Sequence, residues 1–370
     1  MASISACMIV KNERRNLART LPNLLQALDE VIVIDTGSSD DTVAFARDCG
    51  ARVISFEWCA DFSAARNFSL QYATSDWILW PDADEWISPF ELPMLKTFLD
   101  SYSGNALGLP ICECPDGTYE PDYTYYRAKI FRNRVGIGFE RPFNEQLVCT
   151  GRTVFPERNS DIVQVIHWGS LFHLPPDDQQ KKIRRNHDIL EALIQKYPSD
   201  PGYLYSLAMT KIGSEPPEVD ATIDLLAQAH SHCPDPQFGQ LILYKLGQIL
   251  FQAGAHAQLD GWLSRILAED PNFVPFLNLF ATREMMQGRY ESATTTLQHA
   301  IAVMVKQTIA EQVDPHEYGS IPYEKLGLAY LGQSRFSEAK AALNQAITLN
   351  PSGNADRFLQ LVADKESQCQ

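Results

Sequence analysis

Four short apolar segments alternate with helix-like segments in the first 80 residues. The runs "ISACMIV" (4–10) and "VIVID" (31–35) are rich in β-branched residues, and a helical pattern around residues 17–28 separates them. The third and fourth strand candidates are "ARVISFEW" (51–58) and "DWILW" (76–80). Strands that are buried on both faces show such near-continuous apolar runs. The pattern therefore predicts an α/β domain in which helices cover a mostly parallel sheet.

Polar residues follow several of these strands. They are the loop "VKNE" (10–13), Asp35 and the carboxylates of "DADE" (82–85). Ligands of parallel sheets bind beyond the carboxyl ends of the strands, so we expect these residues at the binding site. A turn of small residues follows Asp35, and we expect Ser39 or Asp40 to be the N-cap of the next helix.

The pattern changes after residue 100. Gly, Pro and aromatic residues become frequent, and strand-like pieces such as "TYYRAKIFR" (124–132) and "EQLVCTG" (145–151) predict mixed sheet and loops up to about residue 175. A helical segment over 177–197 leads to "PSDP", a turn-rich boundary near 198–201. We therefore expect a first domain over 1–176, a linker helix over 177–200 and a second domain over 201–370.

The second domain repeats a helical pattern. Pairs of apolar and small residues recur at Leu207-Ala208, Leu246-Gly247, Phe280-Ala281 and Leu326-Gly327. The middle copy begins 34 residues after its predecessor and the last copy 46 residues later, so about a dozen residues are inserted, around 306–320. The pattern resembles tetratricopeptide repeats, each a pair of antiparallel helices. Stacked repeats present a concave face whether or not it is used, so a protein partner on that face is left open.

Composition excludes some function classes. The net charge of −15 argues against non-specific binding to DNA or to an anionic membrane, although a local basic patch is left open. The eight cysteines include no CxxC pair and no zinc spacing, which favours thiols in a reducing compartment. The N-terminus lacks a charged segment followed by a long apolar one. We expect a cytoplasmic protein without a transmembrane segment.

Three carboxylates crowd the end of the fourth strand candidate. Asp82 and Asp84 form a D-x-D pair there, and like charges so close disfavour one another unless a cation lies among them. Mg²⁺ or Mn²⁺ commonly binds a few protein carboxylates while substrate phosphates complete its shell. The pair predicts a metal ion that holds a diphosphate, although D-x-D pairs are also common in ordinary loops.

Asp35 and Arg66 each allow two interpretations. Asp35 could accept a hydrogen bond from an imide N–H such as that of uracil, or it could belong to an ordinary turn between strand and helix. Arg66 lies in a helix-like stretch, "DFSAARNFSL" (61–70), where a surface salt bridge is the usual outcome. Its guanidinium also suits bidentate contact with phosphate.

Four ordered motifs resemble family 2 glycosyltransferases. They are "CMIVKNERRNL", "VIVIDTGSSDDT", "FEWCADFSAARNFSL" and "DWILWPDADE". The likeness is strongest to the bacterial "MIVKNE" subgroup, which includes lipopolysaccharide-core glucosyltransferases and bacteriocin S-glycosyltransferases. It covers roughly the first 175 residues and, through the repeats, most of the remainder. The resemblance implies a nucleotide-diphospho-sugar transferase (GT-A, Rossmann-like) catalytic domain followed by an all-α tetratricopeptide-like domain.

The resemblance also implies roles for individual residues. The nucleotide would be bound by Val10, Lys11, Glu13, Asp35, Arg66 and Asp82, and the metal, Mn²⁺ or Mg²⁺, by Asp84, Asp82 and His167, with His173 as a competitor. Glu145 in "FNEQL" resembles the general base of related "HEQ" sequences, so that Asn144 replaces a histidine. The alternative bases nearby are Asp116, Glu120 and Asp122.

The implied activity is a metal-dependent hexosyl transfer with inversion. A UDP-sugar is the expected donor, while the sugar and the acceptor, a glycan, a lipid or a peptide, are left open. The alternatives are a nucleotidyltransferase on the same fold and a non-catalytic repeat scaffold with a relic first domain. A phosphatase of the haloacid-dehalogenase type is disfavoured because "DTGSS" lacks a second Asp.

Overall fold

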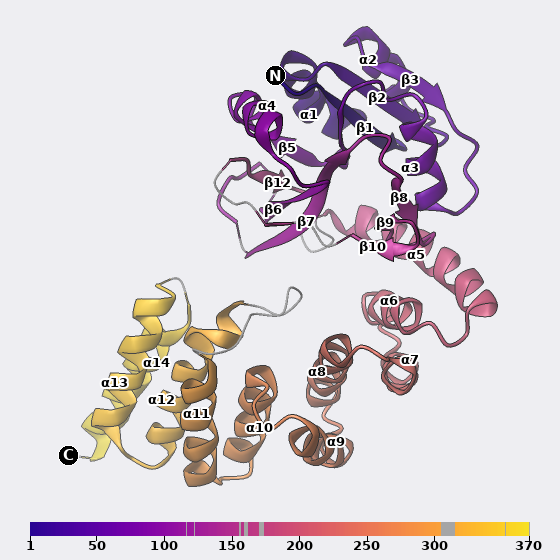
Figure 1. Cartoon of the computed structure of the whole chain (residues 1–370). Helices are drawn as coiled ribbons and strands as arrows, with labels where there is room; N and C mark the ends of the chain where they lie inside the picture. Colours follow the sequence, from indigo (N-terminus) through magenta and orange to yellow (C-terminus); the bar gives the residue numbers. More distant parts are fainter. Residues whose placement is uncertain are drawn as a thin grey trace. The chain divides into compact units, whose positions relative to one another are not determined.

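The computed structural model describes residues 1–115, 117–121, 123–154, 157–158, 162–169, 174–304, 315–351 and 353–369. The chain divides into two compact units, Met1–Arg185 and Asn186–Gln370 (Figure 1). The division falls within helix α5 (Pro176–Lys196), in the segment expected to be a linker helix. The domain limits at residues 176 and 200 stay predictions.

A nine-stranded mixed sheet forms the centre of the first unit, with strand order β3-β2-β1-β4-β7-β6-β12-β5 and with β11 paired to β6. Its strands are β1 (Ile4–Val10), β2 (Glu30–Asp35), β3 (Arg52–Ser55), β4 (Trp77–Leu79), β5 (Glu85–Ile87), β6 (Ala106–Glu113), β7 (Tyr123–Arg132), β11 (Glu157–Arg158) and β12 (Val165–His167). The first four strands pair in parallel, whereas β7 is antiparallel to both of its neighbours. The expected change from parallel to mixed sheet is confirmed.

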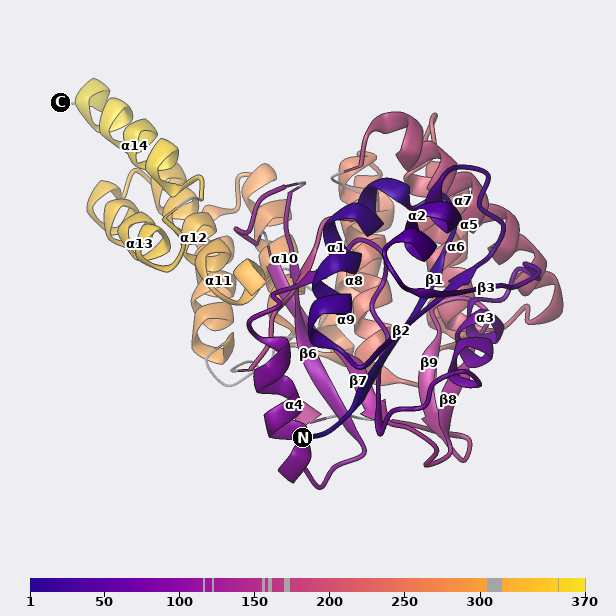
Figure 2. The ribbon, with the colours of Figure 1, turned by 90° about the horizontal axis from the view of Figure 1, so that it is seen from above.

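Helices cover both faces of this sheet. Helices α1 (Arg14–Ala27), α2 (Thr42–Asp48) and α4 (Leu92–Ser101) pack their apolar residues on one face. Helix α3 (Phe62–Leu70) packs on the other face, beside a small sheet of β8 (Ile137–Glu140), β9 (Gln146–Cys149) and β10 (Arg152–Thr153) (Figure 2). In α1 the buried residues Leu17, Leu21 and Leu24 recur at helical spacing and form one apolar stripe.

The expected N-cap of α2 is wrong. The helix begins at Thr42, and Asp41 is its N-cap residue. Asp40 instead accepts a hydrogen bond from the Thr42 N–H through Oδ1 at 2.9 Å. A short Asp side chain can bond the backbone two residues further along, which explains why Asp40 closes the turn before the helix rather than capping it.

The second unit is a series of paired helices (Figures 1 and 2). They are α6 (Pro201–Ile212), α7 (Val219–His232), α8 (Pro236–Gln252), α9 (His256–Glu269), α10 (Val274–Met286), α11 (Tyr290–Met304), α12 (Ser320–Gly332), α13 (Phe336–Leu349) and α14 (Ala355–Cys369). The residue pairs that mark the repeats in the sequence, from Leu207-Ala208 to Leu326-Gly327, each lie in the first helix of a helical hairpin. These helices are α6, α8, α10 and α12. Gly327 shows why a small residue is needed there, since a Cβ would lie 2.6 Å from Leu343 Cγ.

Most of the expected insertion lies outside the described residues. Residues 305–314 belong to that part, and the short 3-10 helix η2 (Pro315–Tyr318) follows them. Across the described residues, no helix is both long and apolar enough to cross a membrane.

Candidate active site

Two loops lie side by side at the carboxyl ends of β1 and β2. Val10 and Asp35 are register partners at the end of these parallel strands. Asn12 then joins the loops, because its backbone N–H donates to Ser38 Oγ at 2.9 Å and its Oδ1 accepts from the Ser39 N–H at 2.7 Å. The sequence prediction that "VKNE" and the loop after Asp35 share one end of the sheet is confirmed.

Asp35 stabilises its own loop. The residue is 7% exposed, and its two oxygens accept hydrogen bonds from the Ser38 N–H at 3.0 Å and the Gly37 N–H at 3.3 Å. Gly37 has a φ of 103°, in the left-handed region that favours glycine. Each carboxylate oxygen keeps a second lone pair, so a contact with uracil stays a prediction beside this structural role.

The other residues of the "VKNE" loop differ in exposure. The Val10 carbonyl accepts from the Thr36 N–H at 2.9 Å, and Lys11 is exposed. Burial, and next the charge of Asp84, raise the pKa of Glu13 to about 7. Glu13 Oε2 accepts a hydrogen bond from the Asn16 side chain at 2.7 Å, which opposes this rise. Contact of these three loop residues with a nucleotide stays a prediction.

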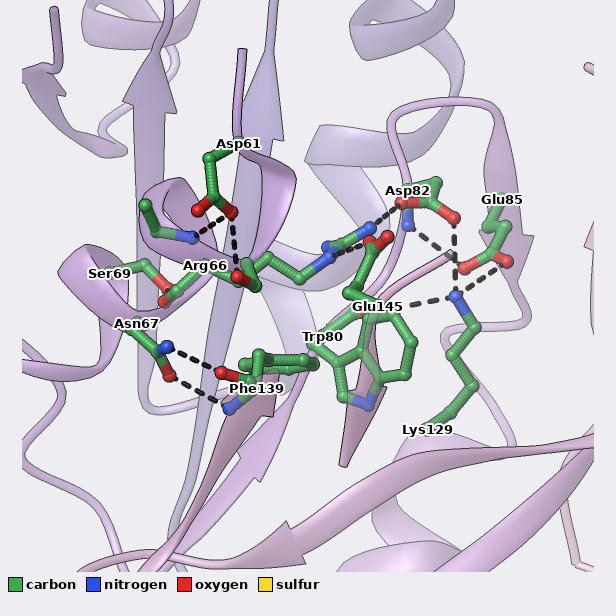
Figure 3. A network of polar contacts seen from close by, with 12 residues as sticks. Asp61, Arg66, Asn67, Ser69, Trp80, Asp82, Glu85, Lys129, Phe139 and Glu145 are labelled. Carbon is green, nitrogen blue, oxygen red and sulfur yellow. Dashed lines mark hydrogen bonds and ion pairs between the residues drawn. The ribbon is translucent and has the colours of Figure 1, made fainter. Parts of the chain in front are cut away.

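Arg66 joins two of the expected site residues (Figure 3). Its Nη2 donates to Asp82 Oδ1 at 2.6 Å, and its Nε donates to Glu145 Oε1. The guanidinium lies 4.5 Å from the centre of the Trp80 ring and the residue is 4% exposed. Burial lowers the pKa of Arg66, but Glu145 and Asp82 outweigh this effect and raise the pKa above its usual range. Arg66 is thus a buried cation shared by two carboxylates, and its contact with the nucleotide stays a prediction.

Lys129 forms a second buried cation in the same network (Figure 3). Its side chain is 1% exposed, and its Nζ lies 2.7 Å from Glu85 Oε1 and 3.3 Å from Asp82 Oδ2. The same nitrogen donates to the Trp80 carbonyl at 3.4 Å. Burial raises the pKa of Asp82, but Lys129 and then Arg66 outweigh it and hold the pKa well below its usual value.

Glu145 lies just before β9 and is ionised by its surroundings. Burial raises its pKa, but the positive charge of Arg66 outweighs burial and lowers the pKa below its usual value. The preceding residue, Asn144, has a φ of 53°, a left-handed conformation that Asn adopts more readily than most residues. This backbone geometry suits an Asn at this position.

Asp84 and His167 meet on the other side of the D-x-D turn. His167 Nε2 lies 3.5 Å from Asp84 Oδ2, and His167 Nδ1 lies 2.8 Å from Glu113 Oε1. Burial lowers the pKa of His167, but the hydrogen bonds to Asp84 and Glu113 outweigh it and raise the pKa to about 10. The competing His173 lies outside the described residues.

The D-x-D carboxylates therefore face different partners. A turn separates them, closed by the Glu85 N–H donating to the Asp82 carbonyl at 3.1 Å. Both oxygens of Asp82 are paired with cationic side chains, whereas Asp84 faces His167. In the described part of the chain, no group of three or more His, Cys, Asp or Glu side chains is arranged to hold a metal ion.

Asp84 and His167 nevertheless fit a divalent ion as two of its ligands. A carboxylate oxygen and an imidazole nitrogen are both donors for first-row metals, and phosphates commonly complete such a shell. Gly169 makes room for the carboxylate, since a Cβ at that position would lie 1.5 Å from Asp84 Oδ2. Asp82 fits less well as a ligand because its charge is already balanced. The metal itself stays a prediction.

The sequence analysis missed several charged residues of this site. Lys129 and Glu113 lie inside apolar strands, in "YRAKIF" and "PICEC". Arg127, also on β7, lies 5.0 Å from the centre of the Trp80 ring. An ionisable residue within a strand that is otherwise apolar was the available signal, because charged side chains are rarely buried without a partner.

Comparison with known proteins identifies the first unit. Residues 5–156 match the model of the family described as glycosyl transferase family 2. They form a family 2 glycosyltransferase domain. The expected fold class, a GT-A-like domain followed by tetratricopeptide-like helices, is confirmed by this match and by the observed elements.

Two curated proteins are similar to parts of this chain. A TPR repeat-containing protein of Synechococcus elongatus is 41% identical over 146 residues, which are 39% of this chain and 35% of the relative. The prophage-derived glycosyltransferase SunS of Bacillus subtilis is 27% identical over 208 residues, 55% of this chain and 48% of SunS. The aligned parts thus span less than half of either relative.

Among solved structures, TarS of S. aureus (residues 1–349) is similar at a TM-score of 0.37 and 15% identity, covering 68% of this chain and 87% of TarS. A likeness at this level does not bear on the function of the glycosyltransferase domain.

Proposed function

We propose that this chain is a metal-dependent, inverting hexosyltransferase that moves a sugar from a UDP-sugar to a glycan, lipid or peptide acceptor. The bridge that Arg66 forms between Asp82 and Glu145 is the observation that carries the proposal. The bridge places Asp82, which is expected to contact the donor, next to Glu145, which is expected to act on the acceptor. Membership of residues 5–156 in the glycosyltransferase family supports the same activity.

In this mechanism Glu145 removes the proton of the acceptor nucleophile. Arg66 keeps this carboxylate, whose side chain is 8% exposed, in the ionised form that a general base requires. A single carboxylate base allows direct displacement at the anomeric carbon, so an α-linked donor yields a β-linked product. The leaving group is the nucleoside diphosphate.

Asp84 and His167 would hold the metal ion, which would stabilise the negative charge developing on the diphosphate. Lys129 and Arg66 lower the pKa of Asp82 and so keep this neighbouring carboxylate ionised. The tetratricopeptide-like unit presents the type of surface on which proteins bind, and a protein partner there is part of the same proposal. A cytoplasmic location remains an expectation from composition.

Uridine diphosphate is expected to bind with high affinity only when Mn²⁺ or Mg²⁺ is present. The carboxylates around Asp84 repel a diphosphate unless a cation lies between them. Isothermal titration calorimetry with and without EDTA measures the difference. Asp84→Asn should weaken the metal-dependent part of binding, while Asp48→Asn, an exposed carboxylate on α2, should leave it unchanged.

Equal affinity with and without EDTA would contradict the metal dependence. Preference for a guanine or thymine nucleotide would contradict only the uracil assignment. Metal-dependent hydrolysis of a UDP-sugar in the absence of acceptor would exclude the scaffold alternative.

Gly169→Ala is expected to abolish metal-dependent binding of uridine diphosphate while the protein remains folded. The added Cβ would occupy the position of Asp84 Oδ2, and the carboxylate, which is 19% exposed, can rotate away. Calorimetry with Mn²⁺ measures the loss and thermal unfolding checks the fold. Gly261→Ala in α9 is the matched control because, in the described part of the chain, the added Cβ would meet nothing within 4 Å beyond its own helix backbone. Unchanged Mn²⁺-dependent affinity in Gly169→Ala would exclude Asp84 as a ligand.

A further inference from the structure

Glu113 and His167 are direct neighbours in the sheet. They are register partners on the parallel strands β6 and β12, and Glu113 Oε1 lies 2.8 Å from His167 Nδ1. The opposite ring nitrogen, Nε2, lies 3.5 Å from Asp84 Oδ2. The imidazole therefore lies between two carboxylates, with Glu113 at Nδ1 and Asp84 at Nε2.

The environment of Glu113 is unusual for a carboxylate. The residue is 3% exposed. Its Oε1 also accepts a hydrogen bond from the Tyr125 hydroxyl at 3.1 Å, while its Oε2 is buried and has no hydrogen-bond partner in the described part of the chain. Burying a charge with an unsatisfied oxygen costs free energy, so stability alone does not account for a carboxylate at this position.

We propose that Glu113 is a positioning residue that orients His167 toward a divalent cation. By accepting a hydrogen bond from Nδ1–H, Glu113 keeps the remaining proton on Nδ1 when a metal ion replaces the proton on Nε2, and it fixes the plane of the ring. Nε2 is then presented next to Asp84 as the second protein ligand. Carboxylates that accept from the distal nitrogen of a metal-binding histidine commonly have this effect. The inference rests on the proposed metal dependence.

Glu113→Gln tests whether residue 113 determines which ring nitrogen of His167 carries the proton. Glu113 can only accept a hydrogen bond, whereas the amide of Gln can turn its NH₂ group toward Nδ1. That contact favours the tautomer with the proton on Nε2. In this tautomer Nε2 has no free lone pair with which to bind a metal ion. Glu113→Gln keeps the size of the side chain, so the fold should survive.

The test is a double-mutant cycle on Mn²⁺ affinity. Mn²⁺ is titrated by calorimetry into the full chain with saturating uridine diphosphate, for the wild type, Glu113→Gln, His167→Ala and the double variant. We expect Glu113→Gln to weaken Mn²⁺ binding about 10- to 100-fold in the wild-type background. In the His167→Ala background the same substitution should change the affinity less than about twofold, because a positioning residue acts only through its partner.

Two further variants keep the test decisive. Glu113→Asp keeps the charge, but the shorter side chain places the carboxylate further from His167 Nδ1. This substitution should therefore also weaken Mn²⁺ binding. Tyr125→Phe removes the other hydrogen bond of Oε1 and leaves the Glu113–His167 contact, so it should have a smaller effect than Glu113→Gln.

The outcomes separate this inference from the proposed function. Wild-type Mn²⁺ affinity in Glu113→Gln, or an equal loss in both backgrounds, would overturn the positioning role while leaving the metal dependence intact. Absence of Mn²⁺ binding by the wild-type protein in the presence of the nucleotide would overturn both.

Discussion

Glu145→Gln is expected to lower glycosyl transfer by about two to four orders of magnitude, the usual contribution of a general base. The amide has nearly the same shape and its oxygen can still accept the hydrogen bond from Arg66 Nε. It cannot take a proton from the acceptor. Binding of uridine diphosphate should therefore survive, and the measurement is a comparison of turnover with nucleotide affinity.

Asp84→Asn is the informative contrast to Glu145→Gln. It should weaken nucleotide binding as well as turnover, because Asp84 is expected to act on the donor before any chemistry takes place. Near-wild-type turnover of Glu145→Gln would show that the base lies elsewhere. Glu120 would then be examined first, together with Asp116 and Asp122, which lie outside the described residues.

The sequence predicted the first unit well where local patterns decide the structure. The apolar runs of β1 and β2 are typical of strands that are buried on both faces. The parallel register of these strands places Val10 beside Asp35. The loops that follow these strands had to meet at one edge of the sheet. The repeats were equally readable, because a small residue such as Gly327 recurs in the first helix of each hairpin, where the helices approach closely.

The internal geometry of the D-x-D motif was not predictable from spacing. The two residues lie close together in the sequence just past a strand, and this suggested that Asp82 and Asp84 bind one cation as a pair. The residues lie in a turn instead, so one carboxylate faces Arg66 and the other faces His167. Only the backbone path after β4 determines this division.

The residues that the analysis missed depend on pairing between distant strands. Glu113 meets His167 because β6 pairs with β12, and Lys129 reaches Glu85 from β7. The register of β6 and β7 also shifts between Leu107 and Gly108, opposite the segment that contains Lys129. No local periodicity encodes such a shift, so a charged residue in an apolar strand was the only visible sign.

Lys129→Met is expected to destabilise the first unit by about 3–5 kcal/mol, the usual cost of removing one partner of a buried ion pair. Met fits the space of the alkyl chain, but Glu85, whose side chain is 3% exposed, would keep a buried charge without its cation. Denaturant unfolding followed by tryptophan fluorescence reports on this unit, because all tryptophans except Trp262 precede residue 186.

Lys96→Met is the matched control for this loss, because Lys96 pairs at 2.8 Å with Asp29, whose side chain is 41% exposed. An ion pair of this exposure contributes about 0–1 kcal/mol, so the control should change the unfolding free energy little. Adding Glu85→Gln to Lys129→Met should recover part of the stability, since it removes the charge that was left unpaired. Equal stability of Lys129→Met and Lys96→Met would show that the network in Figure 3 does not depend on the buried cation. Recovery by Glu85→Gln would instead show that Lys129 is retained to balance the carboxylates of the site, so that Asp82 can stay ionised beside the donor.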